Sequence, residues 1–298
     1  MRVVESVREL QELADEERGS GRRIALVPTM GALHEGHLSL VDEARRKADF
    51  IVLSIFVNPT QFGPTEDLDA YPRPRERDLD LCREAGVDVV FAPSAAEVYP
   101  EASQTFVAVE ELSKPLCGRS RPTHFRGVAT VVTKLLVAAK PHVAVFGEKD
   151  FQQLALVRRL VRDLLFDVEI VGAPIARESD GLARSSRNLN LDSDARDQAV
   201  VLSRALDAAE AVVSAGELDA AAILDLVRAE LSHAPRAAID YAELCDPDSL
   251  SPIGPRLTAP TLLALAVRFH PLPGATGPVV RLIDNRILVP RHAGEERT

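Results

Sequence analysis

Tryptophan is absent from this chain of 298 residues, and aromatic side chains make up only 4% of it. Cysteine is also sparse, because Cys82, Cys117 and Cys245 are the only three and lack the close spacing of metal ligands. A small, odd number of cysteines argues against a disulfide framework and fits a reducing compartment.

Long hydrophobic runs are missing as well. No apolar stretch approaches the roughly 20 residues of a transmembrane helix, and residues 1–20 are too charged for a signal peptide. These absences predict a cytoplasmic protein. The net charge of −10 argues against a broad nucleic-acid surface, so an anion site here must gather positive charge locally.

The pattern that is present alternates apolar strands with amphipathic helices. The composition is that of an ordinary globular protein, with 46% hydrophobic and 27% charged residues, and the length suits two domains. Alternation of this kind predicts an α/β fold, a Rossmann-like doubly wound parallel sheet. The predicted strands are 24–27, 50–57, 87–91, 142–146 and 167–171, with a further candidate at 104–109; the predicted helices are 4–17, 36–47, 73–85, 128–139 and 151–165; residues 119–127 are predicted to form a basic loop.

The character of the chain changes after Ala173. Residues 177–190 are polar and predict a loop, and the remainder predicts a smaller C-terminal α+β domain. Its predicted helices are 194–214 and 218–232, and its predicted strands are 239–245, 261–269 and 279–284. The predicted domains are therefore residues 1–175 and 176–298.

The strongest functional signal lies in residues 27–37, where a predicted strand meets a proline and a glycine and passes into a helix. In an open α/β sheet this carboxyl edge is where ligands bind. His34 and His37 share a face of the first helical turn, and the backbone N–H groups there suit a phosphate. A surface loop with two histidines is the alternative for so short a motif.

Three further segments carry polar groups at strand ends or in loops. Gly147, Lys149 and Asp150 follow a predicted strand and suit a nucleotide, although a capped helix with surface polar groups explains them equally well. The segment 180–188 suits a phosphate or is an ordinary linker. Gln61, after the strand that ends near Asn58, suits a carboxylate or hydroxyl of a small substrate.

Taken together, these segments resemble the pantothenate synthetase family (pantoate–β-alanine ligases), within the nucleotidyltransferase superfamily that shares the HxGH motif. The resemblance covers residues 24–190 in the order 28–37, 56–62, 146–150 and 185–188. It implies an ATP-dependent ligase that joins (R)-pantoate to β-alanine through a pantoyl adenylate and releases AMP and pyrophosphate. It also implies Mg²⁺ with the ATP, a homodimer, and a C-terminal domain that closes over the active site.

The family roles fall on matching positions of this chain. The resemblance implies catalytic roles for His34, His37 and Lys149, with His37 as proton donor. It implies that pantoate is bound by Gln61 and Gln153 and that β-alanine is bound by Gln61. The implied ATP-binding residues are Met30, Gly31, Ala32, Leu33, His34, Glu35, Gly36, His37, Gly147, Glu148, Lys149, Asp150, Ala176, Arg184, Ser185, Ser186 and Arg187.

Some positions and some alternatives stay open. Arg184 stands where the family pattern has an apolar residue, and it either keeps a backbone contact or reaches a phosphate. His124 and Arg126 belong to a segment near the implied pantoate site. Asp78 is predicted to lie on a helix surface, and the alternative is that it holds a magnesium-bound water. The rival functions are another nucleotidyltransferase with a different acceptor, an inactive nucleotide-binding module, and a tRNA-binding protein, which the charge opposes. The direct metal ligands are not predicted.

Overall fold

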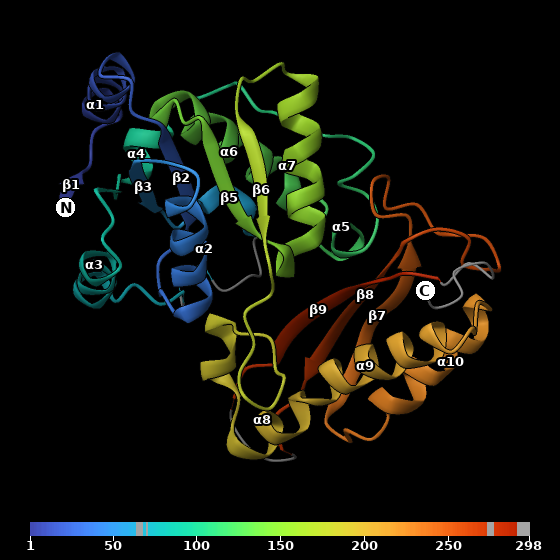
Figure 1. Ribbon diagram of the computed structural model, residues 1–298. Helices are drawn as coiled ribbons and strands as arrows, with labels where there is room; N and C mark the ends of the chain where they lie inside the picture. Colours follow the sequence, from blue (N-terminus) through green and yellow to red (C-terminus); the bar gives the residue numbers. More distant parts are fainter. Residues whose placement is uncertain (64–67, 70, 273–276, 291–298) are drawn as a thin grey trace. The chain divides into compact units, whose positions relative to one another are not determined.

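The chain forms two compact units in the computed structural model, Met1–Ile175 and Ala176–Thr298, each described here by itself (Figure 1). The structure describes residues 1–63, 68–69, 71–272 and 277–290. Among these, no helix is long and apolar enough to cross a membrane.

The first unit contains a parallel sheet of six strands in the order β1-β4-β3-β2-β5-β6. The strands are β1 (Arg2–Val4), β2 (Ile24–Thr29), β3 (Phe50–Ile55), β4 (Val89–Phe91), β5 (Val143–Gly147) and β6 (Glu169–Ala173). The central strands are buried on both faces, as their continuous apolar sequences predict. The doubly wound α/β fold is therefore confirmed.

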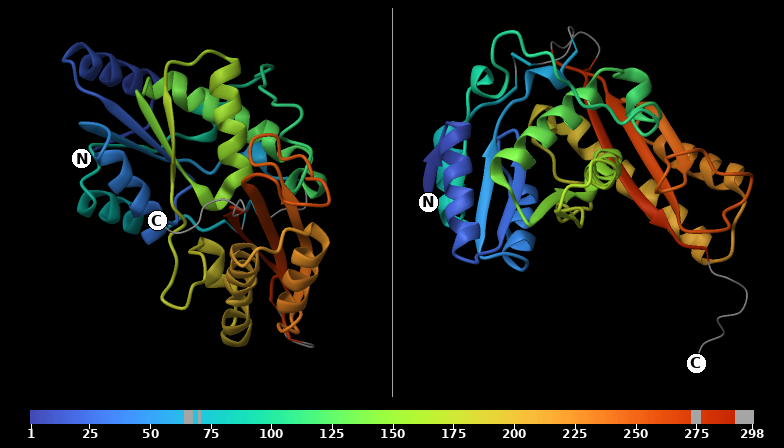
Figure 2. Two further views of the ribbon diagram at one scale, coloured as in Figure 1. Left: turned by 45° about the vertical axis from the view of Figure 1, so that its right-hand side comes forward. Right: turned by 90° about the horizontal axis from the view of Figure 1, so that it is seen from above.

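Helices cover both faces of this sheet and bury alternate side chains of each strand (Figure 2). Ile24 and Leu26 of β2 join one core with α1, α6 and α7, whereas Ala25 and Val27 join a second core with α2 and α3. The elements of this unit are α1 (Val7–Gly19), α2 (Glu35–Arg45), η1 (Pro59–Gln61), α3 (Arg75–Glu84), α4 (Ala95–Val98), α5 (Cys117–Ser120), α6 (His124–Ala139), η2 (Glu148–Asp150) and α7 (Phe151–Asp163).

Two predictions for this unit were wrong in detail, and one strand was not predicted. The predicted strand 104–109 is irregular: Val107 exchanges backbone hydrogen bonds with the Thr130 hydroxyl of α6 and joins no sheet. The predicted loop 119–127 is partly helical, because α5 and the first turn of α6 occupy its ends. The short strand β1 was missed, because three residues carry no readable alternation.

The second unit pairs an antiparallel three-stranded sheet with helices. Its strands are β7 (Ala237–Cys245), β8 (Thr261–Phe269) and β9 (Val280–Leu288), in the order β7-β8-β9. Helices α9 (Val201–Ser214) and α10 (Ala220–Leu231) lie on one face of the sheet (Figure 2) and share its core. The predicted helix 194–214 is divided at Val200 into α8 (Ser193–Ala199) and α9, and the predicted loop contains η3 (Ser186–Asn190).

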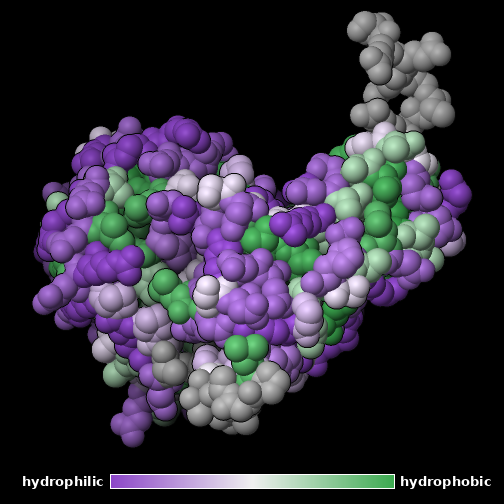
Figure 3. All heavy atoms as spheres, turned by 90° about the horizontal axis from the view of Figure 1, so that it is seen from below, coloured by the Kyte–Doolittle hydropathy of each residue, from purple (hydrophilic) through white to green (hydrophobic). Residues whose placement is uncertain are grey.

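The surface agrees with the acidic, charge-rich composition. In the face drawn in Figure 3 most of the surface is hydrophilic, and hydrophobic side chains form smaller patches among the charged ones. Leu165 and Leu189 are the most exposed large hydrophobic side chains of the described residues, at 88% and 77%. Single exposed apolar residues of this kind are ordinary and indicate no site by themselves.

Candidate functional site

The two segments with the strongest phosphate-binding pattern follow neighbouring strands. Strand β2 pairs with β5 through Ala25↔Val143 and Leu26↔Ala144, and the strand order reverses between them. Residues 30–37 follow β2, and Gly147–Asp150 end β5 and form η2. The fold therefore brings both segments to the switch point of the sheet, where open α/β folds bind ligands.

His34 and His37 form a close pair with tilted rings at the start of α2. Their ring centroids are 4.1 Å apart. His34 is the N-cap residue, and its Nδ1 accepts from the Gly36 N–H at 3.1 Å, while Nδ1 of His37 accepts from the His34 N–H at 3.4 Å. An imidazole that accepts at Nδ1 carries its proton on Nε2 when neutral. The cap therefore fixes both rings as Nε2–H donors at the positive end of the helix.

His37 is neutral at physiological pH in this structure. Burial of the imidazole lowers the pKa of His37 to about 3, and repulsion from His34 and Lys149 acts in the same direction. Lys149, on η2 after β5, thus lies close enough to His37 for the two charges to interact. Lys149 is therefore a positive charge close to the pair, and His37 is a neutral donor.

A buried carboxylate holds the turn that precedes these histidines. Asp78 of α3 is only 1% exposed, and its Oδ2 and Oδ1 accept from the N–H groups of Ala32 and Leu33, both at 2.8 Å. The prediction that Asp78 lies on a helix surface was wrong, because those two N–H groups need a buried acceptor. Asp78 lies in a stretch of charged residues, so the sequence does not distinguish it from a surface carboxylate.

Gly31 is required for the same contact. Its φ is +83°, and an added Cβ would lie 2.9 Å from Oδ2 of Asp78 and 3.0 Å from Cγ2 of Ile55. A side chain at this position would be strained and would push the carboxylate away from the turn. The sequence Met-Gly-Ala-Leu is therefore required for the shape of the turn, in addition to any contact that it makes with a ligand.

The amides after β3 form a hydrogen-bonded cluster. Asn58 is 1% exposed; its Nδ2 donates to Oε1 of Gln61 at 3.0 Å and to the Gly127 carbonyl at 3.1 Å, and its Oδ1 accepts from the Tyr99 hydroxyl at 2.9 Å. The other end of the Gln61 amide, Nε2, donates to Sδ of Met30 at 3.1 Å. The cluster therefore aims Gln61 at Met30, the first residue of the segment 30–37 that contains the HxGH motif.

Helix α6 supports this amide cluster from the other side. Nδ1 of His124 lies 2.9 Å from the Gln61 carbonyl, and Arg121 donates to the same carbonyl at 3.3 Å. Gly127 makes the close approach possible, because an added Cβ would lie 2.4 Å from the Thr60 carbonyl. Arg126 instead stacks over the Phe106 ring at 4.0 Å. Of the two basic positions left open, His124 contacts Gln61, whereas Arg126 is engaged with Phe106.

Two adjacent glutamines at the start of α7 differ in their surroundings. Gln152 is buried and bonds three backbone groups: it accepts from the Cys117 N–H at 3.1 Å and donates to the carbonyls of Leu112 at 3.0 Å and Pro115 at 2.8 Å. The Gln153 side chain makes no hydrogen bond to the described residues and is partly exposed. Gln152 is therefore committed to the fold, whereas Gln153 has an amide available for a ligand.

A cleft of about 420 Å³ opens at the same carboxyl edge, on the side of the sheet that α3 covers. Its walls include Met30, Gly31 and Asp78, the last residue of β3 with the two apolar residues that follow it, and Ala92 and Pro93 after β4. The cleft therefore adjoins the HxGH turn from the β3–β4 side.

The remaining predicted ATP-binding residues belong to the second unit. Ala176 and Arg184 face each other in a short hairpin, and Ser185 caps η3 by accepting from the Arg187 N–H at 3.3 Å. Arg184 lies near Glu178, whose pKa is lowered chiefly by its hydrogen bond to Arg196, with a smaller contribution from Arg184. The arrangement gives a defined backbone at Arg184, which fits a main-chain contact irrespective of its side chain.

No cluster of three or more His, Cys, Asp or Glu side chains suited to a metal ion occurs in the described ranges. Mg²⁺ commonly keeps several waters and binds through one or two carboxylates together with substrate phosphates. Among the described residues, the donor set therefore offers no preformed site of three or more such ligands for a metal ion.

The fold, with two polar segments at the switch point of its parallel sheet, is typical of α/β nucleotide-binding proteins. Comparison with known families makes this specific: the model of the pantoate-beta-alanine ligase family matches residues 2–287. The chain belongs to this family.

Curated relatives and solved structures agree. The chain is 52% identical over 297 residues to pantothenate synthetase of Geobacter sulfurreducens, covering 100% of both chains, and 54% identical over 290 residues to that of Syntrophobacter fumaroxidans, covering 97% of this chain and 99% of the relative. The Thermus thermophilus pantothenate synthetase structure has a TM-score of 0.89 at 47% identity, covering 97% of this chain and all of the other. A Francisella tularensis pantoate-beta-alanine ligase, complexed with beta-gamma ATP and beta-alanine, has a TM-score of 0.74 at 31% identity, covering 96% and 97%.

Proposed function

We propose that this chain is an ATP-dependent ligase that condenses (R)-pantoate with β-alanine to give pantothenate, AMP and pyrophosphate. The observation that carries the proposal is the convergence of three groups in the first unit: the histidine pair, the nearby Lys149, and the Gln61 amide bonded to Met30. Family membership and the names of the full-length relatives support the same activity. They favour pantoate as acceptor over the acceptors of other nucleotidyltransferases.

In the first step, a pantoate carboxylate oxygen attacks the α-phosphorus of ATP, the bond to the bridging oxygen breaks, and pyrophosphate leaves. Such a displacement depends on orientation and on neutralising charge. Lys149 supplies a cation, and the Nε2–H groups of His34 and His37 donate to phosphate oxygens. A bound polyphosphate would raise the pKa of His37, so this ring becomes able to protonate the departing group.

Pantoate is held by the amides of Gln61 and Gln153. Neutral amides orient the substrate without drawing electron density from its carboxylate as a nearby cation would. Oε1 of Gln61 is fixed by Asn58, so its Nε2 points in a defined direction, at present toward Met30. Among the described residues, Gln153 has no side-chain hydrogen-bonding partner to give up when pantoate binds.

In the second step, the free amine of β-alanine attacks the acyl carbon of the adenylate. A C–N bond forms, the bond to the AMP oxygen breaks, and the amine proton passes to solvent or to the leaving phosphate. Gln61 is proposed to contact β-alanine as well as pantoate. The residues Ala176, Arg184, Ser185, Ser186 and Arg187 are proposed to close over the nucleotide from the C-terminal domain.

Three further properties are part of the proposal. Mg²⁺ enters with ATP and offsets the charge of its phosphates. The active form is a homodimer, as the family resemblance implies. The compartment is the cytoplasm, which is compatible with three cysteines that all lie in described ranges and form no disulfide.

The direct test incubates the protein with ATP, Mg²⁺, pantoate and β-alanine, and then omits each in turn. Pantothenate and AMP are expected only in the complete mixture. ATP and pantoate without β-alanine are expected to release about one equivalent of pyrophosphate per site, because a closed pocket retains the reactive adenylate. Release of ADP and phosphate would contradict the adenylate mechanism.

A further inference from the structure

The segment that opens the second unit, residues 176–187, folds as a short hairpin. Arg177 and Ala183 form an antiparallel bridge, and the Arg184 N–H donates to the Ala176 carbonyl at 2.9 Å. Glu178 donates through its N–H to the Leu182 carbonyl at 2.8 Å. Ala176 and Arg184, two positions proposed to contact ATP, are therefore held against each other across this hairpin.

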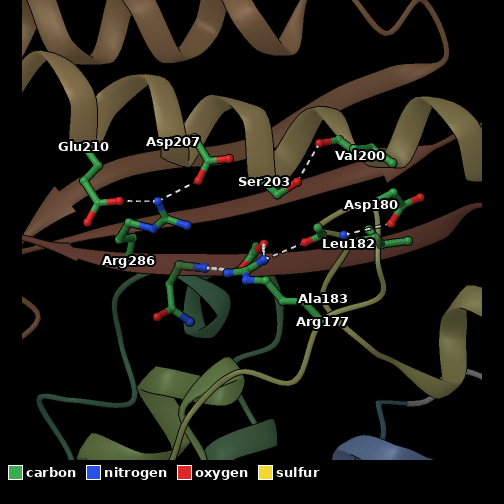
Figure 4. A network of polar contacts seen from close by, with 12 residues as sticks. Arg177, Asp180, Leu182, Ala183, Val200, Ser203, Asp207, Glu210 and Arg286 are labelled. Carbon is green, nitrogen blue, oxygen red and sulfur yellow. Dashed lines mark hydrogen bonds and ion pairs between the residues drawn. The ribbon is translucent and has the colours of Figure 1, made fainter.

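One arginine ties the hairpin to the sheet of its own unit (Figure 4). Arg177 donates from Nη1 to Oδ2 of Asp284 at 2.6 Å and from Nη2 to Oδ1 at 2.9 Å, and Nη1 also donates to the Gly181 carbonyl at 3.0 Å. The same side chain thus bonds the turn of the hairpin and strand β9. A bidentate pair of this kind fixes orientation as well as distance.

Asp284 is a rigid partner for this arginine. It is 2% exposed, it pairs with Leu265 in the centre of the β8–β9 ladder, and its Oδ1 also accepts from the Asn285 N–H at 2.8 Å. Neither Asp284 nor Arg177 is among the residues proposed to contact a substrate. Asp284 is therefore a buried carboxylate that supports the proposed ATP-binding hairpin without being one of its residues.

Further contacts leave the hairpin little freedom to slide. Arg196 bridges Glu178 at 2.8 Å and Asp180 at 2.7 Å. Gly181 has a φ of +96°, and an added Cβ would lie 2.9 Å from Oγ of Ser203 on α9. The hairpin is thus supported at its turn by α9, along its side by α8, and at its base by β9.

We propose that Asp284, acting through Arg177, is a positioning residue that holds hairpin 176–187 in the conformation that presents Ala176 and Arg184–Arg187 to ATP. The inference rests on the proposed function for the identity of the ligand, and it adds a residue outside the binding set. Without the anchor, the hairpin samples other conformations, and the apparent affinity for ATP falls in proportion to the population of the competent one.

The test variant is Asp284→Asn, which keeps the size of the side chain and turns one acceptor into a donor that faces the guanidinium. If the hairpin keeps the competent conformation in about a tenth of the molecules, the Kd for ATP measured by calorimetry rises about 10-fold. The KM for β-alanine is expected to stay within about twofold, because the anchor bears on the nucleotide segment alone. Deuterium exchange of the peptide 176–187, without ligand, is expected to quicken.

Arg286→Gln is the matched control. Arg286 lies on the same strand, two residues along, and pairs with Asp207 at 2.7 Å and with Glu210, both on α9 (Figure 4). Its ion pairs also join β9 to another element, but they do not reach the hairpin. The control is expected to lose some thermal stability while its ATP affinity and the exchange of peptide 176–187 match the parent.

The outcomes distinguish the positioning role of Asp284 from the proposed ligase activity. An unchanged ATP affinity in Asp284→Asn, or an equal loss in the Arg286→Gln control, overturns the positioning role. If Asp284→Asn does not fold, Arg177→Lys replaces it, because it retains the charge but cannot bond Asp284 twice, and the same two measurements decide. If the parent binds ATP but makes no pantothenate, the proposed function fails while calorimetry and exchange still judge the anchor.

Discussion

Alanine variants of Gln152 and Gln153, adjacent residues of α7, are expected to separate an effect on stability from an effect on substrate binding. Gln152→Ala removes a buried amide from the Cys117 N–H and from the carbonyls of Leu112 and Pro115. Each unsatisfied buried group costs about 1–3 kcal/mol, and partial relaxation makes the sum about 2–5 kcal/mol. At about 2–4 °C per kcal/mol for a chain of this size, Tm is expected to fall by roughly 5–15 °C.

Gln153→Ala is expected to show the opposite pattern, with little change in Tm and a large change in the KM for pantoate. Its side chain makes no hydrogen bond to the described residues, so its removal is expected to leave Tm within about 2 °C of the parent, as for ordinary surface substitutions. If the amide binds pantoate, its loss is expected to raise the KM for pantoate by roughly 5–150-fold, the equivalent of about 1–3 kcal/mol. The KM for ATP should change far less.

The assay measures Tm by calorimetry and the KM of each substrate by coupled pyrophosphate release, for both variants beside the parent. The reasoning predicts opposite patterns from two neighbouring residues of the same type. A large pantoate effect in Gln152→Ala with a stable fold, or a large Tm loss in Gln153→Ala, would refute it.

Three other predictions follow from the site. His37→Ala and Lys149→Ala are expected to slow adenylate formation by on the order of 10²–10³-fold, while preformed pantoyl adenylate is converted at a rate much closer to that of the parent; equal losses in both half-reactions, measured on folded variants, would contradict a role at the phosphates. Asp78→Ala leaves the N–H groups of Ala32 and Leu33 without their acceptor and is expected to cost about 2–5 kcal/mol of unfolding free energy, as measured by urea denaturation; a cost below about 0.5 kcal/mol, the range of surface substitutions, would show that the clamp is dispensable. Because the pKa of His37 is about 3 in the folded chain and 6.5 in the reference state, the unfolded chain binds more protons between these values, so stability is lost as pH falls through this window; urea titrations should show a shallower loss for His37→Gln, and identical slopes would refute the shift.

Several elements were readable from sequence for clear reasons. Strand β3 is apolar at nearly every position, and only a strand covered on both faces has that pattern, so its central place was predictable. The start of α2 was readable because a proline and a glycine interrupt the apolar run just before it. Strand β1 and the break at Val200 carry no comparable local signal, since tertiary contacts decide both.

For the site, local sequence identified candidates but not their partners. The HxGH segment, Gly147–Asp150 and Gln61 stand out because they follow strands, and parallel strands bring their carboxyl ends to one edge. Their roles in binding and catalysis stay predictions. Asp78 and Asp284 could not be found in this way, because each is one acidic residue among 45 and only burial distinguishes it.

The sequence by itself determined the periodicity, and hence the α/β class, and the order of the polar motifs along the chain. Only the tertiary structure decided which of those groups meet, because hydrogen bonds such as Asp78 to Ala32 and Leu33, or Arg177 to Asp284, join residues far apart in sequence. It also decided that, of two neighbouring glutamines, Gln152 is bonded into the fold while the Gln153 side chain has no hydrogen bond to the described residues. A helix turns by about 100° per residue, so adjacent side chains face different surroundings that the sequence alone does not name.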